Sequence, residues 1–273
     1  MWPVMTTELG ARLEQVSADW NEACLLPTHA VPESQMGAWV HRFGAARAFV
    51  VTGRRHPERY NVVLGVGDEH ADLIGQIVEL YRERGLPVRI DLAPGSLTER
   101  LALALARHGL CQTRFNVTLY GLPAQSTQPV PADVTIRQVQ SEADLETLVD
   151  VAIAGFEGEP VSDAERSASI ERFRSGRLRL YLAYIDGEAA AFGSLFTSDG
   201  IGYLAGGATR PEFRRRGCQT ALIHVRISAA ATLGCEIVMV TAAFGSTSQH
   251  NLERAGLRIA YTKAIWTELA VKD

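Results

Sequence analysis

The strongest constraint on the fold of this chain is an order of predicted elements that occurs twice. Each half ends in a helix, a strand, a second helix and a second strand, and a glycine follows each helix. The glycines are Gly85, Gly109, Gly234 and Gly256, and the strands are expected at 88–92, 114–120, 236–240 and 258–266. Glycine suits the left-handed backbone position that ends a helix, and short runs of Val and Ile suit buried strands. The repeated order indicates a weak internal duplication in an α/β chain.

Residues 122–131 separate the two halves. This segment holds three prolines among small polar residues and has no hydrophobic period, as is typical of a solvated linker. The chain has 273 residues, enough for two cores of ordinary size. We therefore expect an N-terminal domain at 1–125, a linker at 126–133 and a C-terminal domain at 134–273.

The C-terminal half also has a readable beginning. A strand at 135–139 precedes residues 141–144, Ser-Glu-Ala-Asp, which have the capping-box pattern of a helix start. A second helix is expected at 164–173, and three strands follow it, separated by the tight-turn pairs Asp-Gly at 186–187 and 199–200. These strands are 178–185, 188–197 and 201–209. The expected order of the half is β-α-α-β-β-β-α-β-α-β.

Composition gives no reason to expect a nucleic acid or a membrane as partner. The net charge is -4, hydrophobic residues make up 47% of the chain and charged residues 21%, which are the proportions of a globular protein. The four cysteines include no CxxC pair, so neither a zinc site nor a disulfide framework is indicated, and we expect no metal. No apolar run has the length of a signal peptide or a membrane span, so we expect a cytoplasmic protein.

One strand-to-helix turn has the residues expected of an anion-binding site. The strand at 201–209 ends before Arg210, and residues 214–219, Arg-Arg-Arg-Gly-Cys-Gln, lead into a helix with one apolar face. The first N–H groups of a helix lack partners and lie at the positive end of its dipole, so such a turn binds anions. Three arginines deepen the positive potential, and Gly217 lets the backbone approach a phosphate closely. The alternative is an ordinary turn with a solvated basic run.

The stretch 208–222 resembles the pyrophosphate loop of the GNAT N-acetyltransferases, usually written Q/R-x-x-G-x-G/A. Arg214 and Gly217 match this pattern, whereas Gln219 stands where glycine or alanine is usual. Residues 60–67, Tyr-Asn-Val-Val-Leu-Gly-Val-Gly, resemble a strand of a GNAT subgroup that has two parts. The resemblance implies tandem GNAT-like domains of the α/β (α+β) class, each with a mixed, mostly antiparallel central sheet flanked by helices.

The resemblance also implies where acetyl-CoA binds. Ala208 and Thr209 would pair with the pantetheine arm through backbone groups. Asn251 would contact the cofactor from the last helix, and the alternative for it is an exposed helix asparagine. The pyrophosphate would lie on Arg214, Arg215, Arg216, Gly217, Cys218, Gln219 and Thr220. The equivalent stretch of the N-terminal half, 66–72, is acidic and cannot attract a pyrophosphate, so we expect one cofactor per chain and a degenerate first domain.

The catalytic groups are less visible in the sequence. Many GNAT proteins have a tyrosine acid four residues before the glycine that ends the last helix, but Leu252 stands there. The polar candidates nearby are Ser248, His250 and Tyr261, each with a structural role as the alternative. Glu157 and Glu159 lie in the loop that lines the acceptor site in this fold. They are interpreted either as a base acting through water or as solvated loop carboxylates.

These features predict an enzyme that transfers an acetyl group from acetyl-CoA to an amine of a small molecule or peptide by direct attack. A covalent route through Cys218 lacks an accompanying His-Asp arrangement. The rival interpretation is a non-catalytic acyl-CoA-binding regulatory module, which Leu252 favours. Glu157, Glu159 and Asp163 weakly favour aminoglycoside or polyamine acceptors, and amino acids or peptide N-termini are equally open. The first domain is expected either to complete the acceptor cleft or to support a homodimer interface.

Overall fold

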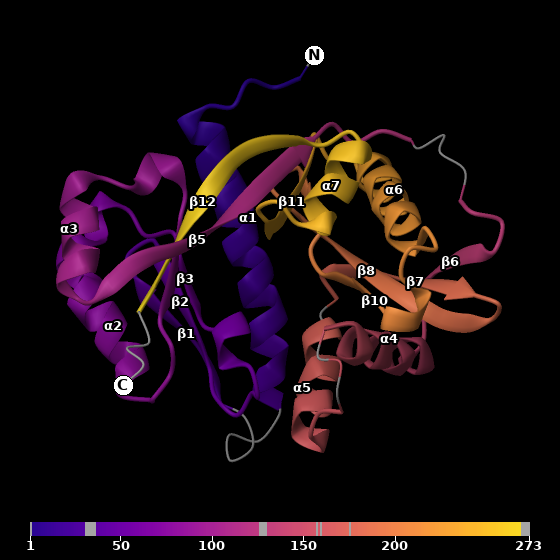
Figure 1. Ribbon diagram of the computed structural model, residues 1–273, viewed down its shortest axis with the longest axis horizontal. Coiled ribbons are helices and arrows are strands. Elements are labelled where there is room, and N and C mark those ends of the chain that lie inside the picture. The colour runs from indigo at the N-terminus through magenta and orange to yellow at the C-terminus, as the bar shows by residue number, and fades with distance from the viewer. Residues whose placement is uncertain are drawn as a thin grey trace.

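The computed structural model describes residues 2–30, 37–125, 130–156, 158, 160–174 and 176–268. It has one open 12-stranded sheet with helices on its faces (Figure 1). The strands lie in the order β1-β2-β3-β4-β12-β5-β11-β9-β8-β7-β6, and β10 pairs with β8. Among the described strands, β3 pairs with β4 and β9 with β11 in parallel, and the other pairs are antiparallel. The expected mixed, mostly antiparallel sheet is therefore confirmed.

The elements predicted from the sequence occur in the predicted order, except that the strand expected at 201–209 is two strands. The N-terminal half contains α1 (Thr7–Leu25), β1 (Ala38–Phe43), β2 (Ala46–Val51), β3 (Val62–Leu64), α2 (Ile74–Arg82), β4 (Arg89–Leu92), α3 (Glu99–Arg107) and β5 (Leu110–Gly121). The C-terminal half contains β6 (Val134–Gln138), α4 (Glu142–Phe156), α5 (Asp163–Phe173), β7 (Leu178–Ile185), β8 (Glu188–Ser198), β9 (Ile201–Tyr203), β10 (Gly207–Thr209), α6 (Cys218–Thr232), β11 (Ile237–Ala243), α7 (Thr247–Arg254) and β12 (Arg258–Glu268). None of the described helices is both long and apolar enough to cross a membrane.

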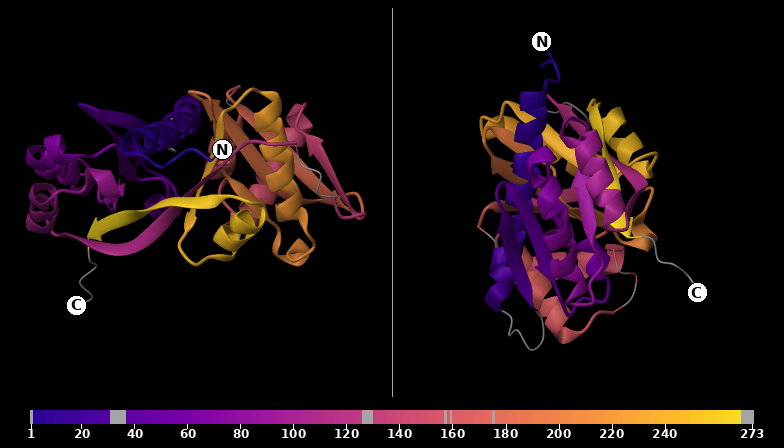
Figure 2. Two further views of the ribbon diagram at one scale, coloured as in Figure 1. Left: turned by 90° about the horizontal axis from the view of Figure 1, so that it is seen from above. Right: turned by 90° about the vertical axis from the view of Figure 1, so that its left-hand side faces the viewer.

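The two halves exchange their last strands. β12, the last strand of the C-terminal half, lies between β4 and β5, and β5, the last strand of the N-terminal half, lies between β12 and β11. Thr118 of β5 is opposite both Tyr261 of β12 and Thr241 of β11. The two long strands run side by side from one half to the other (Figures 1 and 2). The sheet is thus continuous across the proposed linker at 126–133, of which 126–129 lie outside the described residues.

The first helix also joins the halves. The Thr6 side chain caps α1 by accepting a hydrogen bond from Leu9 N–H at 3.1 Å, which satisfies one of the amides that a helix start leaves without a partner. Leu13 and Val16 are fully buried against a cluster that includes Tyr203 and Met239 of the C-terminal strands. Farther along, Ala18 and Leu25 pack with residues of β2 and β3. This helix was not among the elements expected from the sequence.

The strand expected at 201–209 divides in two. β9 pairs in parallel with β11, but the chain bulges at residues 204–206, and β10 then pairs with β8. Gly206 has φ +65°, in the left-handed region that favours glycine, and its carbonyl accepts a hydrogen bond from Ser194 N–H at 3.1 Å. β10 pairs with β8, whereas β11 pairs with β9 and β5. Among the described strands none pairs with the other edge of β10, and the place between this edge and β11 is called the wedge below.

Candidate active site

The wedge leads to the turn that the sequence predicts as an anion site. Gly217 is the N-cap of α6 with φ +81°, and Arg215 has φ +65°, so two left-handed residues shape the turn. A Cβ at Gly217 would lie 2.8 Å from Cγ of Pro131, so both backbone angle and space require glycine there. The amides at the start of α6, on Cys218, Gln219 and Thr220, have no helical carbonyl to bond and face the turn.

The three arginines of the turn have different environments. Arg214 donates from Nε to Thr209 O at 3.3 Å and from Nη2 to Gly155 O at 3.4 Å, so it ties the turn to the end of α4. Arg216 forms ion pairs with Asp133 at 2.8 Å and Asp186 at 3.5 Å, so its charge is already balanced by carboxylates of the same half. Arg215 is exposed and makes no hydrogen bond or ion pair with a described residue. Arg215 is therefore the arginine best suited to meet an incoming anion.

The backbone of β10 offers hydrogen-bonding groups to the wedge. Bonds from Ser194 N–H to Gly206 O and from Arg210 N–H to Ala190 O show which residues face β8. Because backbone groups alternate along a strand, those of Gly207 and Thr209 face the open edge. Ala208 faces β8 instead, so its backbone groups bond within the sheet. Of the two residues named in the sequence analysis, Ala208 and Thr209, only Thr209 has its backbone groups on the open edge.

A buried arginine donates a hydrogen bond to the bulge. Arg226 of α6 is 2% exposed and donates to the carbonyl oxygens of Leu222, Ser194 and Gly206 at 3.0, 3.1 and 3.1 Å. Burial lowers the pKa of Arg226 to about 10, so the guanidinium stays charged at neutral pH. A fixed positive charge therefore lies against the bulge between β9 and β10.

Gln219 and Cys218 occupy the inner side of the turn. Gln219 Nε2 lies 3.2 Å from where a Cβ on Gly207 would be, and its Oε1 is buried without a hydrogen-bond partner among the described residues. Burial raises the pKa of the Cys218 thiol, which is 1% exposed. A protonated, buried thiol is a poor nucleophile, so the geometry supports direct transfer over a covalent route through Cys218.

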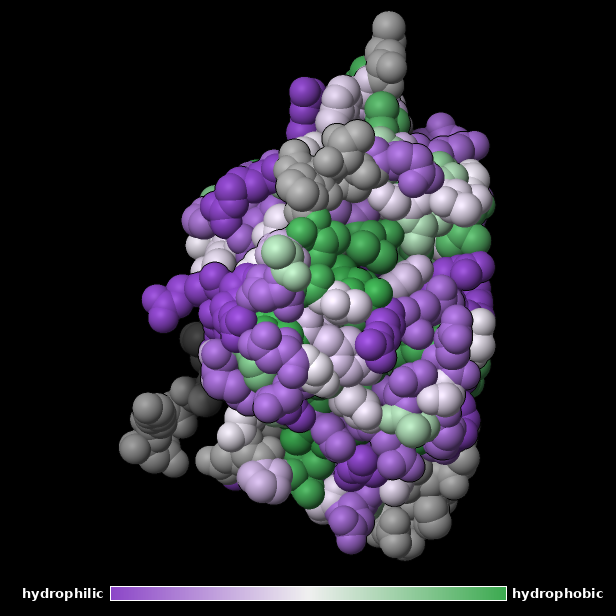
Figure 3. All heavy atoms as spheres, turned by 90° about the vertical axis from the view of Figure 1, so that its right-hand side faces the viewer, coloured by the Kyte–Doolittle hydropathy of each residue, from purple (hydrophilic) through white to green (hydrophobic). Residues whose placement is uncertain are grey.

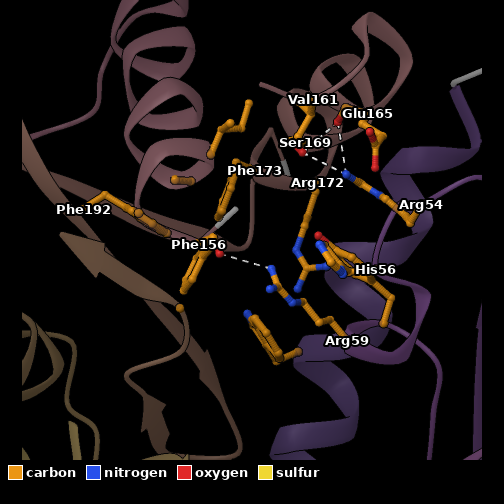
Figure 4. A pocket seen from close by; sticks show the side chains of 16 residues that line it. Arg54, His56, Arg59, Phe156, Val161, Glu165, Ser169, Arg172, Phe173 and Phe192 are labelled. Carbon is orange, nitrogen blue, oxygen red and sulfur yellow. Dashed lines mark hydrogen bonds between the residues drawn. The ribbon is translucent and has the colours of Figure 1, made fainter. Parts of the chain in front are cut away.

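A cavity of about 380 Å³ adjoins the bulge. Gly206 and Gly155 line it from the wedge side, and α4, α5 and β8 contribute three phenylalanines. These are Phe156, Phe173 and Phe192. The opposite wall carries Arg54, His56 and Arg59, from the segment between β2 and β3 in the N-terminal half, and Arg172 of α5 (Figure 4). The N-terminal half thus helps to line a cavity that reaches Gly206.

Hydrogen bonds fasten the N-terminal segment to α5. Arg55 N–H donates to Glu165 Oε1 at 2.8 Å, and Arg54 Nη1 donates to Glu165 O and Ser169 Oγ, both at 3.1 Å. Burial alone would raise the pKa of Glu165, but hydrogen bonds from Arg55 N–H and Ser162, with the charge of Arg54, outweigh it and lower the pKa. The carboxylate is therefore a structural anchor at the seam between the halves.

Glu165→Gln is expected to destabilise the protein by about 1–3 kcal/mol at neutral pH, because the charged acceptor of a part-buried backbone amide is lost. The folded pKa of Glu165 lies below its unfolded value of about 4.3, so its contribution is complete above that pH and is lost as the pH falls through the folded pKa. Urea unfolding at pH 7 and in steps below pH 4.5 would measure both effects, with Glu171→Gln as control. An unchanged acid dependence in Glu165→Gln would contradict this assignment.

The other candidates from the sequence do not gather at the bulge. Ser248 and His250 are exposed on α7. Asn251 accepts a hydrogen bond from Arg254 of its own helix, whereas Leu252 is 3% exposed and packs in the core. Glu157 lies outside the described residues, as does Glu159.

Tyr261 is separated from the wedge by two strands. It is opposite Thr118 of β5, which is in turn opposite Thr241 of β11. The Tyr261 hydroxyl donates to Glu14 Oε1 at 2.6 Å, and burial, followed by the charge of Glu14, raises its pKa. The side chain lines a second cavity beside α1 and not the cavity at Gly206. Its position supports the structural alternative for Tyr261.

Two further observations concern the surface of the C-terminal half and the residue types that commonly bind metal ions. Seen from the side of this half, the surface is largely hydrophilic, with apolar side chains gathered between hydrophilic flanks (Figure 3). Within the part of the chain that the structure describes, no group of three or more His, Cys, Asp or Glu side chains could hold a metal ion.

Comparisons with known proteins agree with this geometry. Residues 130–243 match the family model described as an acetyltransferase (GNAT) domain. A GCN5-related N-acetyltransferase from Kribbella flavida has a TM-score of 0.67 at 15% identity, over 94% of this chain and 95% of that one. A GCN5-related N-acetyltransferase from Sphaerobacter thermophilus has a TM-score of 0.61 at 18% identity, over 82% and 76%.

A tandem GNAT protein from the clavulanic acid biosynthesis pathway has a TM-score of 0.60 at 14% identity, over 92% of this chain and 88% of that one. No curated protein sequence gives a significant match. The structural likenesses show the fold, and the family model identifies the domain that contains the wedge and the turn. Residues 130–243 are therefore a GNAT acetyltransferase domain, and the chain as a whole shares the fold of these GNAT structures.

Proposed function

We propose that this acetyltransferase uses acetyl-CoA as donor and an amine of a small molecule or peptide as acceptor, by direct attack. One observation carries the proposal: the bulge at Gly206 is shared by the wedge that leads to the anion-binding turn and by a cavity large enough for a small acceptor. A donor in the wedge and an acceptor in the cavity would therefore meet at this bulge.

The residues around the wedge fit an extended anionic thioester. The amides of Cys218, Gln219 and Thr220, with the Arg215 side chain, would hold the pyrophosphate, because unpaired amides at a helix start favour anions. Gly207 and Thr209 would pair with the pantetheine arm. The buried, unpaired Oε1 of Gln219 beside Gly207 is an acceptor in need of a donor, as an amide of that arm would provide.

Acetyl transfer from a thioester to an amine needs little help from acid–base side chains. Acetyl-CoA supplies an activated thioester, and the overall exchange forms an amide C–N bond, breaks the C–S bond and moves one proton from nitrogen to sulfur. The charge on Arg226 would stabilise negative charge that develops near Gly206, because it acts from a water-excluded position. Glu157 acting through water remains the proposed base, and Ser248 and His250 remain low-priority candidates for the acid.

The rival proposal is a non-catalytic acyl-CoA-binding module. Leu252, which occupies the usual tyrosine position, packs in the core and can supply no proton, and this observation favours the rival. Release of free CoA in the presence of an amine acceptor separates the two proposals. That the first half is a degenerate copy without cofactor, and that the chain forms a homodimer, stay predictions.

Arg215→Glu is expected to weaken acetyl-CoA binding at least about tenfold, because it places a negative charge where the pyrophosphate would lie. The substitution keeps a Cβ at the position and so leaves the backbone of the turn as it is. Isothermal calorimetry with acetyl-CoA measures the effect, and Arg107→Glu, on the exposed face of α3, is the matched charge control. Equal affinity in Arg215→Glu and the parent chain would place the donor elsewhere.

A further inference from the structure

Arg226 of α6 is a buried cation that forms no ion pair with any described residue. Its guanidinium bonds to the carbonyl oxygens of Leu222, Ser194 and Gly206. Carbonyl dipoles satisfy N–H donors but leave the net charge in place, and a buried charge normally has a partner of opposite sign. Resting on the proposed function, we propose that Arg226 stabilises the departing sulfur of CoA as a thiolate, so that acyl transfer needs no side-chain acid.

Two facing glycines make room for the guanidinium. Gly193 of β8 and Gly207 of β10 are opposite each other in register. A Cβ at Gly193 would lie 2.8 Å from Arg226 Nε, and a Cβ at Gly207 would lie 3.8 Å from Nη1. Glycine inside a strand weakens the strand, and it commonly marks a place where another group approaches the backbone closely. The cation therefore lies directly against β10, the strand along which the donor arm would run.

Arg226 also lies at the same level of the fold as the proposed reaction centre. From Cys218 to Arg226 the helix rises about 12 Å, and from Thr209 back to Gly206 the strand direction covers about 10 Å. Helix and strand thus both lead from the anion-binding turn to the bulge. With the pyrophosphate on the turn and the arm along β10, the sulfur would reach the level of Gly206, whose carbonyl oxygen is 3.1 Å from Arg226 Nη1.

The step balances without a proton donor in the site. The amine nitrogen attacks the acyl carbon, the new C–N bond forms, and the electron pair of the broken C–S bond stays on sulfur. The surplus proton of the amine passes to water through the proposed base, and the thiolate takes a proton from solvent after release. A fixed positive charge in a water-excluded position lowers the free energy of such a thiolate. Leu252, which can supply no proton, is then no obstacle to turnover.

Other charged groups approach the bulge from the opposite face of the sheet. Phe192 packs in the cluster of α4 and its neighbour Ala191 in the cluster of α6, so these helices cover opposite faces. On the α6 face, Tyr181 of β7 is the described titratable side chain whose charge acts on Arg226, and burial raises the pKa of Tyr181, so it stays neutral near pH 8. The titratable side chains that line the cavity on the α4 face are Arg54, His56, Arg59, Tyr60, Glu165 and Arg172.

The test measures the protons released when CoA binds. Calorimetry of the full chain is carried out in buffers of different ionisation enthalpy, with CoA and with desulfo-CoA, which lacks the sulfur atom. We expect CoA to release protons on binding at about pH 8, where a free thiol is largely protonated, and desulfo-CoA to release none beyond those of the protein. Because the thiolate is favoured in the complex, the affinity for CoA relative to desulfo-CoA should rise at least about tenfold between about pH 6 and about pH 9.

Three variants assign this effect to its residue. Arg226→Gln should remove the extra proton release and the rise of the affinity ratio, whereas Arg226→Lys, which keeps the charge, should retain most of both. Tyr181→Phe, beside the guanidinium, should leave both unchanged. A purely structural role of Arg226 would change the affinities for CoA and desulfo-CoA alike.

The outcomes separate this inference from the proposed donor. CoA that binds the parent chain without releasing more protons than desulfo-CoA would overturn the inference, and this comparison needs no variant to fold. Extra proton release that persists in Arg226→Gln would overturn it as well, because the effect would then come from other groups. Failure of CoA to bind the parent chain would overturn both the inference and the proposed donor.

Discussion

A chain that lacks residues 1–125 is expected to fail to fold. The deletion removes β5, which is in register with ten residues of β12 and six of β11, so both strands lose their shared neighbour. It also removes α1, whose Leu13 and Val16 cover Tyr203 and Met239 in the C-terminal half. The deletion also removes β4, the other neighbour of β12, so the remaining chain would expose apolar surface, one edge of β11 and both edges of β12. Near-UV circular dichroism and urea unfolding should show no cooperative transition.

A matched experiment divides the chain into two fragments and keeps all of its residues. Residues 1–125 and 126–273, co-expressed as separate chains, should assemble into a complex that unfolds cooperatively, because the exchanged strands need contact between halves and not covalent continuity. A fragment 126–273 that alone unfolds cooperatively and binds acetyl-CoA would show that the exchange contributes little, and would support two separable domains at the proposed boundary.

Glu14→Ala is expected to cost about 3–5 kcal/mol of stability, because it leaves a buried cation unpaired. Glu14 Oε2 of α1 lies 2.7 Å from Lys263 Nζ of β12, and the side chains are 13% and 2% exposed. Burial alone would lower the pKa of Lys263, but the charges of Glu14 and Asp91 outweigh it and raise the pKa. The ammonium therefore stays charged and needs its carboxylate.

Two further variants separate charge from packing. The double variant Glu14→Leu with Lys263→Met should recover much of the loss, because it removes both charges and keeps apolar volume. Glu8→Ala, at an exposed position of the same helix, should cost little. Urea unfolding measures all three free energies of unfolding. A Glu14→Ala variant within 1 kcal/mol of the parent chain would contradict this account.

Local patterns in the sequence predicted the elements well. The four glycines expected after helices all have positive φ, and α6 begins directly after Gly217 as the turn motif requires. These features depend on a few neighbouring residues, whose backbone preferences act over one or two turns. The strand at 201–209 was too long by comparison, because the interruption at Gly206 depends on Ser194 and Arg226, which are distant in sequence.

The pairing of strands and the acceptor cavity could not be found in the same way. A run of β-branched residues predicts a strand but not which strand lies beside it. The residue patterns of β5 and β12 would be the same whether these strands paired within one half or between the halves. The basic residues at 54–59 formed a visible charge cluster, but only the fold brings them against Phe156 and Arg172. Side chains that converge from both halves leave no spacing pattern in the sequence.

The exchange of β5 and β12 has a consequence for synthesis on the ribosome. Nascent chains commonly fold from the N-terminus, one unit at a time. Here the first half cannot complete its sheet until β12, the last strand to emerge, is inserted between β4 and β5. Contacts such as Ile265 with Asp91 have a large sequence separation, which slows folding. Until β12 has left the ribosome, the newly made first half would therefore present an unfilled position between β4 and β5, which a chaperone could cover during that interval.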